Sequence, residues 1–186
     1  MTEPVQVIRY GAPPRSVVAI VNPNTRRAPD LVERALRGAC PADVSCAIRY
    51  SESPGHATEL ARTHAKSCDL IVAAGGDGTV SDVAAGLLGS HVPLAILPAG
   101  STNIVAQELG IPADLSAAAR LIFTPHGLLR RDIGLCGDRV FLHMAGAGFD
   151  AHFFDRSDRE LKRRVGWLAY LPAAASALGE APASYT

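Results

Sequence analysis

Short apolar runs alternate with amphipathic segments over the first two thirds of the chain. Four runs have the length and the β-branched content of strands, namely 17–21, 44–50, 70–74 and 93–98. Apolar residues that recur three or four positions apart predict helices over 29–38, 56–66, 80–88, 104–109 and 114–122. This alternation predicts an α/β fold in which helices flank a mostly parallel sheet.

The pattern changes after Pro125. The predicted elements there are a strand pair, 128–135 and 139–145, joined by a turn at Gly137-Asp138, and a helix over 157–178 that opens on a capping box. Two strands and one helix cannot close a hydrophobic core of their own. We therefore divide the chain into a first domain, 1–125, and an incomplete portion of a β-rich second domain, 126–186.

The composition narrows the class of protein. Hydrophobic residues make up 48% of the chain and charged residues 19%, which is typical of a globular protein. Because 18 basic residues balance 18 acidic ones and aromatics are only 5%, we expect no nucleic-acid partner. The four cysteines lack metal-site or C-x-x-C spacing, which predicts reduced thiols in a cytoplasmic protein. Peripheral contact with the inner face of the membrane and a homo-oligomeric state stay open.

The strongest chemical signal follows the third predicted strand, where the chain has Gly75-Gly76-Asp77-Gly78-Thr79 ahead of a helix. A strand, a glycine turn and a helix together present backbone N–H groups and a positive helix end to an anion. The Asp77 carboxylate would repel a phosphate unless a cation such as Mg²⁺ lies between them. The segment therefore predicts a nucleotide–metal site, and the alternative is a tight structural turn.

Three more loops with small polar residues follow predicted strands, at 22–26, 51–55 and 98–103. The carboxyl ends of parallel strands lie at one edge of a sheet, so we expect these loops to build a single site with 75–79. Each has a structural alternative. Asn22 with Pro23 is equally typical of a turn, a serine-rich loop around Ser51 needs no ligand, and Ser101 could serve as a helix N-cap.

Four segments in this order resemble the diacylglycerol kinase catalytic-domain family, which includes bacterial lipid kinases and sphingosine kinases. They are Asn22-Pro23, Gly55-His56-Ala57, 75–79, and 98–103 together with Leu109-Gly110-Ile111-Pro112. Two later segments, 148–151 and 166–170, are similar to the second domain of that family. The resemblance implies an NAD kinase/diacylglycerol kinase-like fold. It also implies ATP- and Mg²⁺-dependent transfer of the γ-phosphate to a lipid hydroxyl, such as that of a diacylglycerol.

The resemblance also implies site residues. Those that would contact ATP are Asn22, Ser51, Gly75, Gly76, Asp77, Gly78, Thr79, Gly100, Ser101 and Asn103. Asp77 would organise the metal or help to activate the acceptor hydroxyl, and it is the candidate catalytic residue. The chain departs from the family at Asp82, where glutamate is usual, and at Ile104, where many relatives have aspartate. Relatives supply an acidic base from a carboxyl-terminal half, whereas this chain is expected to stop short of it at Thr186.

Two other functions stay open. An NAD kinase-like enzyme would share the core of the 75–79 turn, although the loop at 98–103 and the segment 148–151 argue against it. The end of the chain at Thr186 suggests a truncated, non-catalytic nucleotide-binding module as the second alternative.

Overall fold

Four parallel strands form the central sheet of the computed structural model, which describes residues 7–11 and 13–143. The strands are β2 (Ser16–Val21), β3 (Ser45–Tyr50), β4 (Leu70–Gly75) and β5 (Leu94–Pro98), in the spatial order β3-β2-β4-β5. Their register aligns the strand ends, with Val21 opposite Tyr50 and Ala74, and Gly75 opposite Pro98. All four predicted strands are confirmed, and the loops that follow them meet at one edge.

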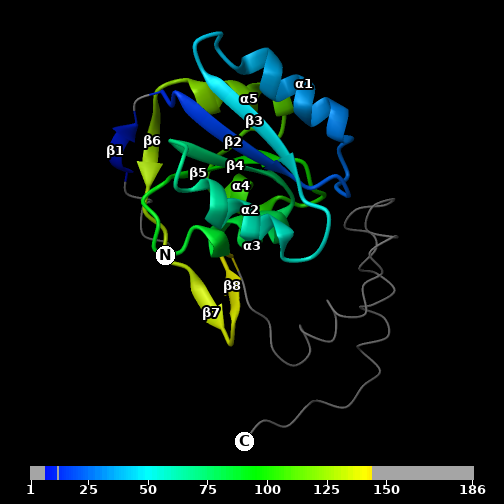
Figure 1. Cartoon of the computed structure of the whole chain (residues 1–186), viewed down its shortest axis with the longest axis vertical. Helices are drawn as coiled ribbons and strands as arrows, with labels where there is room; N and C mark the ends of the chain where they lie inside the picture. The colour runs from blue at the N-terminus through cyan, green and yellow to red at the C-terminus, as the bar shows by residue number, and fades with distance from the viewer. Residues whose placement is uncertain (1–6, 12, 144–186) are drawn as a thin grey trace, which may run out of the picture. The chain divides into compact units, whose positions relative to one another are not determined.

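Helices cover both faces of this sheet (Figure 1). The helices are α1 (Pro29–Ala39), α2 (His56–His64), α3 (Asp77–Gly86), α4 (Ile104–Glu108) and α5 (Leu115–Phe123). Side chains alternate between the two faces: Val17 and Ala19 pack with α1 and α5, whereas Val18 and Ile20 pack with α2, α3 and α4. Because both faces are buried, β2 and β4 are nearly continuous apolar runs, the pattern from which they were predicted.

The helix after β4 starts earlier than the sequence pattern predicts. Asp77, Gly78 and Thr79 form the first turn of α3, so the predicted turn at 75–79 reduces to Gly76, an extended residue with φ −92° and ψ −175°. An acidic residue is favoured in the first turn of a helix because the helix dipole is positive there. The carboxylate of Asp77 therefore lies at the very start of α3.

The predicted strand 128–135 is wrong as a single element. It is divided into β6 (His126–Leu129) and β7 (Gly134–Cys136), because the charged run Arg130-Arg131-Asp132 interrupts the apolar pattern. β7 pairs antiparallel with β8 (Arg139–Phe141) across Gly137 at φ 58°, which confirms the predicted turn. The second strand ends at Phe141 rather than at 145, and positions 144 and 145 lie outside the described residues.

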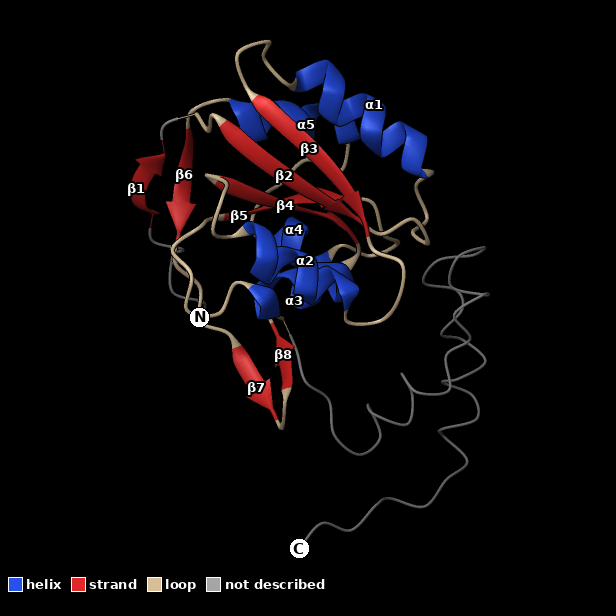
Figure 2. Cartoon of the chain, viewed as in Figure 1, coloured by secondary structure: helices blue, strands red, loops and turns tan. Residues whose placement is uncertain are grey.

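β6 pairs antiparallel with β1 (Val7–Gly11), a strand that the sequence pattern does not predict (Figure 2). The residues up to Leu142 belong to one compact unit. The predicted helix at 157–178 and the segments 148–151 and 166–170 lie outside the described part of the chain, and the domain boundary at residue 125 stays a prediction. In the described part, no helix has the length and the apolar character needed to cross a membrane.

Candidate functional site

Backbone hydrogen bonds join three of the four predicted loops at the carboxyl edge of the sheet. The N–H of Asn22 donates to the carbonyl of Ala74 at 3.0 Å, and that of Arg27 donates to the carbonyl of Ala99 at 3.1 Å. The N–H of Ala99 in turn donates to the carbonyl of Gly75 at 2.9 Å. The loops that follow β2, β4 and β5 therefore form one continuous structure, as the sequence predicts.

Both polar atoms of the Asn22 side-chain amide form hydrogen bonds. Its Oδ1 accepts a hydrogen bond from the N–H of Asn24 at 2.9 Å, which forms an Asx turn, and its Nδ2 donates to Oγ1 of Thr79 at 3.1 Å. Asn22 therefore makes the turn after β2 and fixes this turn to the first turn of α3. Its contact with ATP stays a prediction.

The glycines of the site have two different surroundings. A Cβ on Gly75 would lie 2.4 Å from Oγ1 of Thr79, and one on Gly100 would lie 2.5 Å from Cα of Gly76. Gly75 is required because the side chain of Thr79 packs directly over it, and Gly100 is required because its loop meets the backbone of Gly76. Gly78 is different, because it is exposed and a Cβ there would meet nothing within 4 Å. Packing therefore explains Gly75 and Gly100, whereas the open space at Gly78 leaves room for a ligand.

The carboxylate of Asp77 connects α3 with α4. Its Oδ1 accepts a hydrogen bond from the N–H of Val105 at 3.0 Å, and its Oδ2 accepts one from the hydroxyl of Thr102 at 3.1 Å. The side-chain amide of Gln107 donates to the carbonyl of Thr102 and holds that residue in place. We call Asp77, Thr102 and Val105 the Asp77 bridge. Each carboxylate oxygen keeps a second lone-pair site, so the bridge does not prevent Asp77 from binding a metal.

Asn103 closes the loop after β5. It adopts the left-handed conformation, with φ 51° and ψ 49°, which asparagine tolerates better than most residues. Its Oδ1 accepts from the N–H of Gly100 at 2.9 Å, and its Nδ2 donates to the carbonyl of the same residue at 3.0 Å. Asn103 is also the N-cap residue of α4, so the alternative that Ser101 serves as the cap is wrong. Ser101 is exposed within the closed loop.

Ser51 lies one strand further from the centre of the site. Its N–H donates to the carbonyl of Val21 at 2.9 Å, which places it beside the turn that begins at Asn22. Ser51 and Thr79, with 9% and 6% of their surface exposed, are the two buried polar residues of the described chain. Buried hydroxyls are uncommon in an apolar core, and both of these lie at predicted site positions.

The sequence pattern did not single out Thr102 or Gln107 as site residues. Thr102 lies in the polar run Ser101-Thr102-Asn103 directly ahead of a helix, a composition typical of helix starts, and this was the available signal. Its partner Asp77 is 25 positions away, so only the tertiary structure pairs the two.

The titratable groups near the site do not form a metal cluster by themselves. Among the described residues, no group of three or more histidine, cysteine, aspartate or glutamate side chains is positioned to hold a metal ion. Partial burial raises the pKa of Asp82, the carboxyl that stands where glutamate is usual in the resembled family. Any Mg²⁺ at this edge would need oxygen ligands from a bound phosphate in addition to Asp77.

The fold and the joined loops define the class of open α/β proteins, in which ligand sites lie beyond the carboxyl ends of the parallel strands. A family model described as the diacylglycerol kinase catalytic domain matches residues 16–134. The chain therefore belongs to the diacylglycerol kinase catalytic domain family, as the sequence motifs predicted.

Relatives and a solved structure agree with this family. The chain is 38% identical over 141 residues to a YegS-like probable lipid kinase of Pseudomonas putida, which covers 74% of this chain and 47% of the relative. It is 39% identical over 122 residues to a diacylglycerol kinase of Bacillus subtilis, covering 62% of this chain and 39% of the relative. A crystal structure of a Bacillus anthracis protein assigned as a diacylglycerol kinase has a TM-score of 0.53 at 32% identity, covering 59% of this chain and 42% of that protein. The chain thus spans less than half the length of each of these proteins.

Proposed function

We propose that this chain carries the Mg·ATP-binding half of a lipid kinase that transfers the γ-phosphate to the hydroxyl of a diacylglycerol-like lipid. The observation that carries the proposal is the Asp77 bridge, a half-buried carboxylate set between the loops after β4 and β5. The names of the relatives, lipid kinase and diacylglycerol kinase, support the class of acceptor.

The residues present fit a nucleotide phosphate with its metal. The first N–H groups of α3 have no partner within the helix, and the open face at Gly78 lets a phosphate approach them. Mg²⁺ would supply charge neutralisation for phosphoryl transfer, and Asp77 would hold it. Asn22 and Thr79 would act by fixing the loop geometry, because their side chains bond to each other. Transfer of this kind depends mainly on positioning and electrostatics, which a rigid pair of loops provides.

One observation favours a second candidate function, that of a non-catalytic nucleotide-binding module. Both oxygens of Asp77 already accept hydrogen bonds from the protein, so the carboxylate has a structural task that needs no metal. The third alternative, an NAD kinase-like enzyme, is disfavoured by a family match that extends over residues 16–134.

Calorimetric titration of ATP with and without Mg²⁺ tests the site through the variant Asp77→Asn. Asparagine can keep both bonds of the bridge, since its Oδ1 can accept from Val105 and its Nδ2 can donate to the Thr102 hydroxyl. It removes only the charge. We expect Mg²⁺-dependent ATP affinity to fall about 10- to 100-fold, the worth of an interaction with a charged group.

Asp114→Asn is the matched control. Asp114 is also a helix-capping carboxylate, which accepts from the N–H of Ala117 at 2.8 Å, but it lies at the start of α5 and outside the site. Its variant should bind ATP as the original chain does. If Asp77→Asn also binds Mg·ATP with unchanged affinity, the metal role of Asp77 is refuted. If the original chain does not bind ATP, the nucleotide proposal fails.

A transfer assay separates the candidate functions. The chain is incubated with labelled ATP and Mg²⁺ together with diacylglycerol in mixed micelles, and in a parallel sample with NAD⁺. Label in the lipid supports the kinase, and label in NAD⁺ supports the NAD kinase-like alternative. ATP binding without transfer to either acceptor supports the non-catalytic module.

A further inference from the structure

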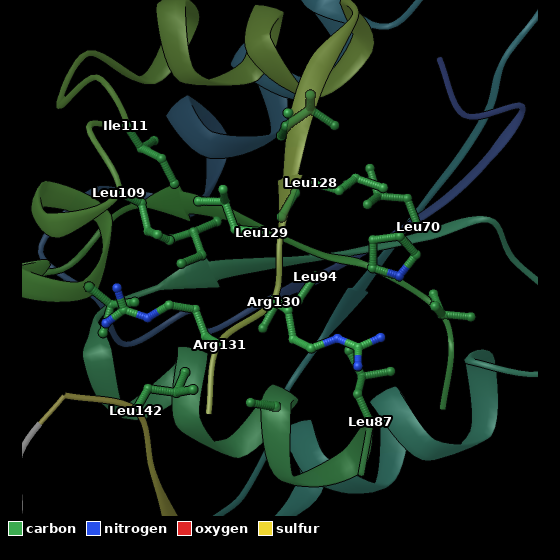
Figure 3. Close-up of a pocket in the computed structure, with 18 of the residues that line it drawn as sticks. Leu70, Leu87, Leu94, Leu109, Ile111, Leu128, Leu129, Arg130, Arg131 and Leu142 are labelled. Atoms are coloured by element: carbon green, nitrogen blue, oxygen red, sulfur yellow. The ribbon is translucent and has the colours of Figure 1, made fainter. Parts of the chain in front are cut away.

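A cavity of about 810 Å³ lies beside the edge strand β5 (Figure 3). It is lined by residues at the starts of strands, such as Leu70 of β4 and Leu94 of β5, whereas the candidate nucleotide loops follow the strand ends. Its volume is within the range of about 300–1,000 Å³ that is usual for small-molecule pockets. Apart from Val105, whose backbone N–H belongs to the Asp77 bridge, the cavity shares no lining residue with the site described above.

Most of the side chains that line the cavity are apolar. Apart from Ser90, His91, Arg130 and Arg131, the lining residues are all apolar or glycine. The strands β5 and β6 contribute much of this surface, including Leu128 and Leu129, and Figure 3 shows Leu109 and Ile111 along another side. Such a surface favours an alkyl chain, because each buried methylene contributes about 0.8 kcal/mol.

The two arginines of the lining differ in their contacts. Arg131 forms an ion pair with Glu108 at 2.8 Å. Arg130 is exposed and makes no hydrogen bond or ion pair with any described residue, although it follows β6 directly and lines the cavity. A guanidinium without a carboxylate partner is well suited to bind a phosphate or carboxylate group.

We propose that this cavity binds a single-chain amphiphile with an anionic headgroup. Its alkyl chain lies among the leucines, and its headgroup pairs with Arg130. The apolar lining and the positive charge beside it are complementary to the two parts of such a molecule. The proposal does not depend on the kinase activity, since the cavity includes neither Asp77 nor any residue of the loop 98–103.

Calorimetric titration of the chain with alkyl phosphates below their micelle concentrations tests the proposal, in the absence of ATP. Octyl and decyl phosphate are compared with decanol, which has the same alkyl chain as decyl phosphate but no charge. We expect decyl phosphate to bind about tenfold tighter than octyl phosphate, because it buries two more methylenes. It should also bind tighter than decanol.

Three variants locate the binding. Arg130→Gln should lower the affinity for decyl phosphate about three- to tenfold, as expected for loss of a partly solvated ion pair. The affinity for decanol should not change. Arg62→Gln, which removes an exposed arginine of α2, is the matched control. It should bind decyl phosphate and decanol with the affinities of the original chain. Ala95→Trp fills the cavity from β5 and should abolish both interactions. Leu129→Trp does the same from β6, so that loss of folding in one variant does not leave the proposal untested.

The contrary results are specific. Equal affinities for octyl and decyl phosphate, or unchanged binding by Arg130→Gln, would overturn the proposal. Binding to vesicles of phosphatidylglycerol without binding of monomeric decyl phosphate would show a surface attraction instead. If no alkyl phosphate binds the original chain, the lipid proposal fails and an extended polypeptide segment beside β5 becomes the favoured occupant.

Discussion

At the scale of single residues, Asp77 has more tasks than its position in a glycine-rich motif suggests. Asp77 is the first residue of α3. Its carboxylate accepts one hydrogen bond from the backbone N–H of Val105 in α4 and another from the hydroxyl of Thr102. Hydrogen bonds to a charged acceptor are stronger than those between neutral groups. These two hydrogen bonds therefore fix the loop after β5 against the first turn of α3.

The substitution Thr102→Val tests the hydrogen bond between Thr102 and Asp77 separately from the charge of Asp77. Valine keeps the shape of the side chain but removes the donor, so we expect a loss of about 1–2 kcal/mol in the free energy of unfolding. ATP affinity should fall several-fold, and Thr102→Ser should restore it. Urea denaturation and calorimetric titration measure the two effects.

Thr63→Val is the control for this substitution, because Thr63 is exposed on α2. Threonine and valine have similar helix propensities, so the control should change stability very little. Equal effects of the two valine variants on ATP affinity would show that the Thr102 hydroxyl does not position the site.

At the scale of elements, α2 and α3 pack closely along the middle and the end of α3. The hydroxyl of Thr58 in α2 donates to the carbonyl of Asp82 in α3 at 2.8 Å. At Gly86, a Cβ would lie 2.3 Å from the carbonyl oxygen of Thr58 and 2.7 Å from Cβ of Ala61. The two helices can therefore pack at this distance only because residue 86 has no side chain.

Gly86→Ala should destabilise the protein, although alanine is the better helix former by about 1 kcal/mol. We expect a net loss of about 1–3 kcal/mol in the free energy of unfolding, because the helices must separate to admit the methyl group. Gly38→Ala in α1 is the matched control, since a Cβ at residue 38 meets nothing within 4 Å. It should stabilise by about 0.5–1 kcal/mol. Stabilisation by both substitutions would contradict the packing argument.

At the scale of the whole molecule, partly buried thiols make the stability depend on pH. Burial raises the pKa of Cys40, Cys46 and Cys68, and for Cys46, which also lies beside Cys40, the pKa rises from 9.0 to about 11. In the unfolded chain the thiol ionises near its ordinary pKa, whereas in the folded chain it stays protonated. This contribution to stability is therefore complete below pH 9 and is lost as the pH rises towards 11.

Urea denaturation at pH 8 and pH 10.5 measures this loss. The free energy of unfolding should fall at the higher pH, and it should fall less in Cys46→Val, which has no thiol to ionise. Cys136→Ala removes an exposed thiol and should keep the pH dependence of the original chain. An identical decrease in all three proteins would exclude a contribution from Cys46.

The sequence alone was sufficient for the central sheet, its helices and the family. Strands such as β2 and β4 are apolar without interruption because helices bury both of their faces, so each is visible from its own residues. β1 was missed because its partner β6 lies more than a hundred positions further along the chain, and no local pattern records that pairing. The loops of the site were found because each follows a strand whose end could be predicted.

What the tertiary structure decided are the relations between segments. The sequence placed Asp77 within a glycine-rich segment at the start of a helix, but its bond to Val105 joins residues 28 positions apart. Likewise, the packing at Gly86 and the cavity beside β5 depend on elements that meet only in the folded chain. Local patterns depend on neighbours along the chain, whereas hydrogen-bond partners and cavities depend on the distances that folding sets.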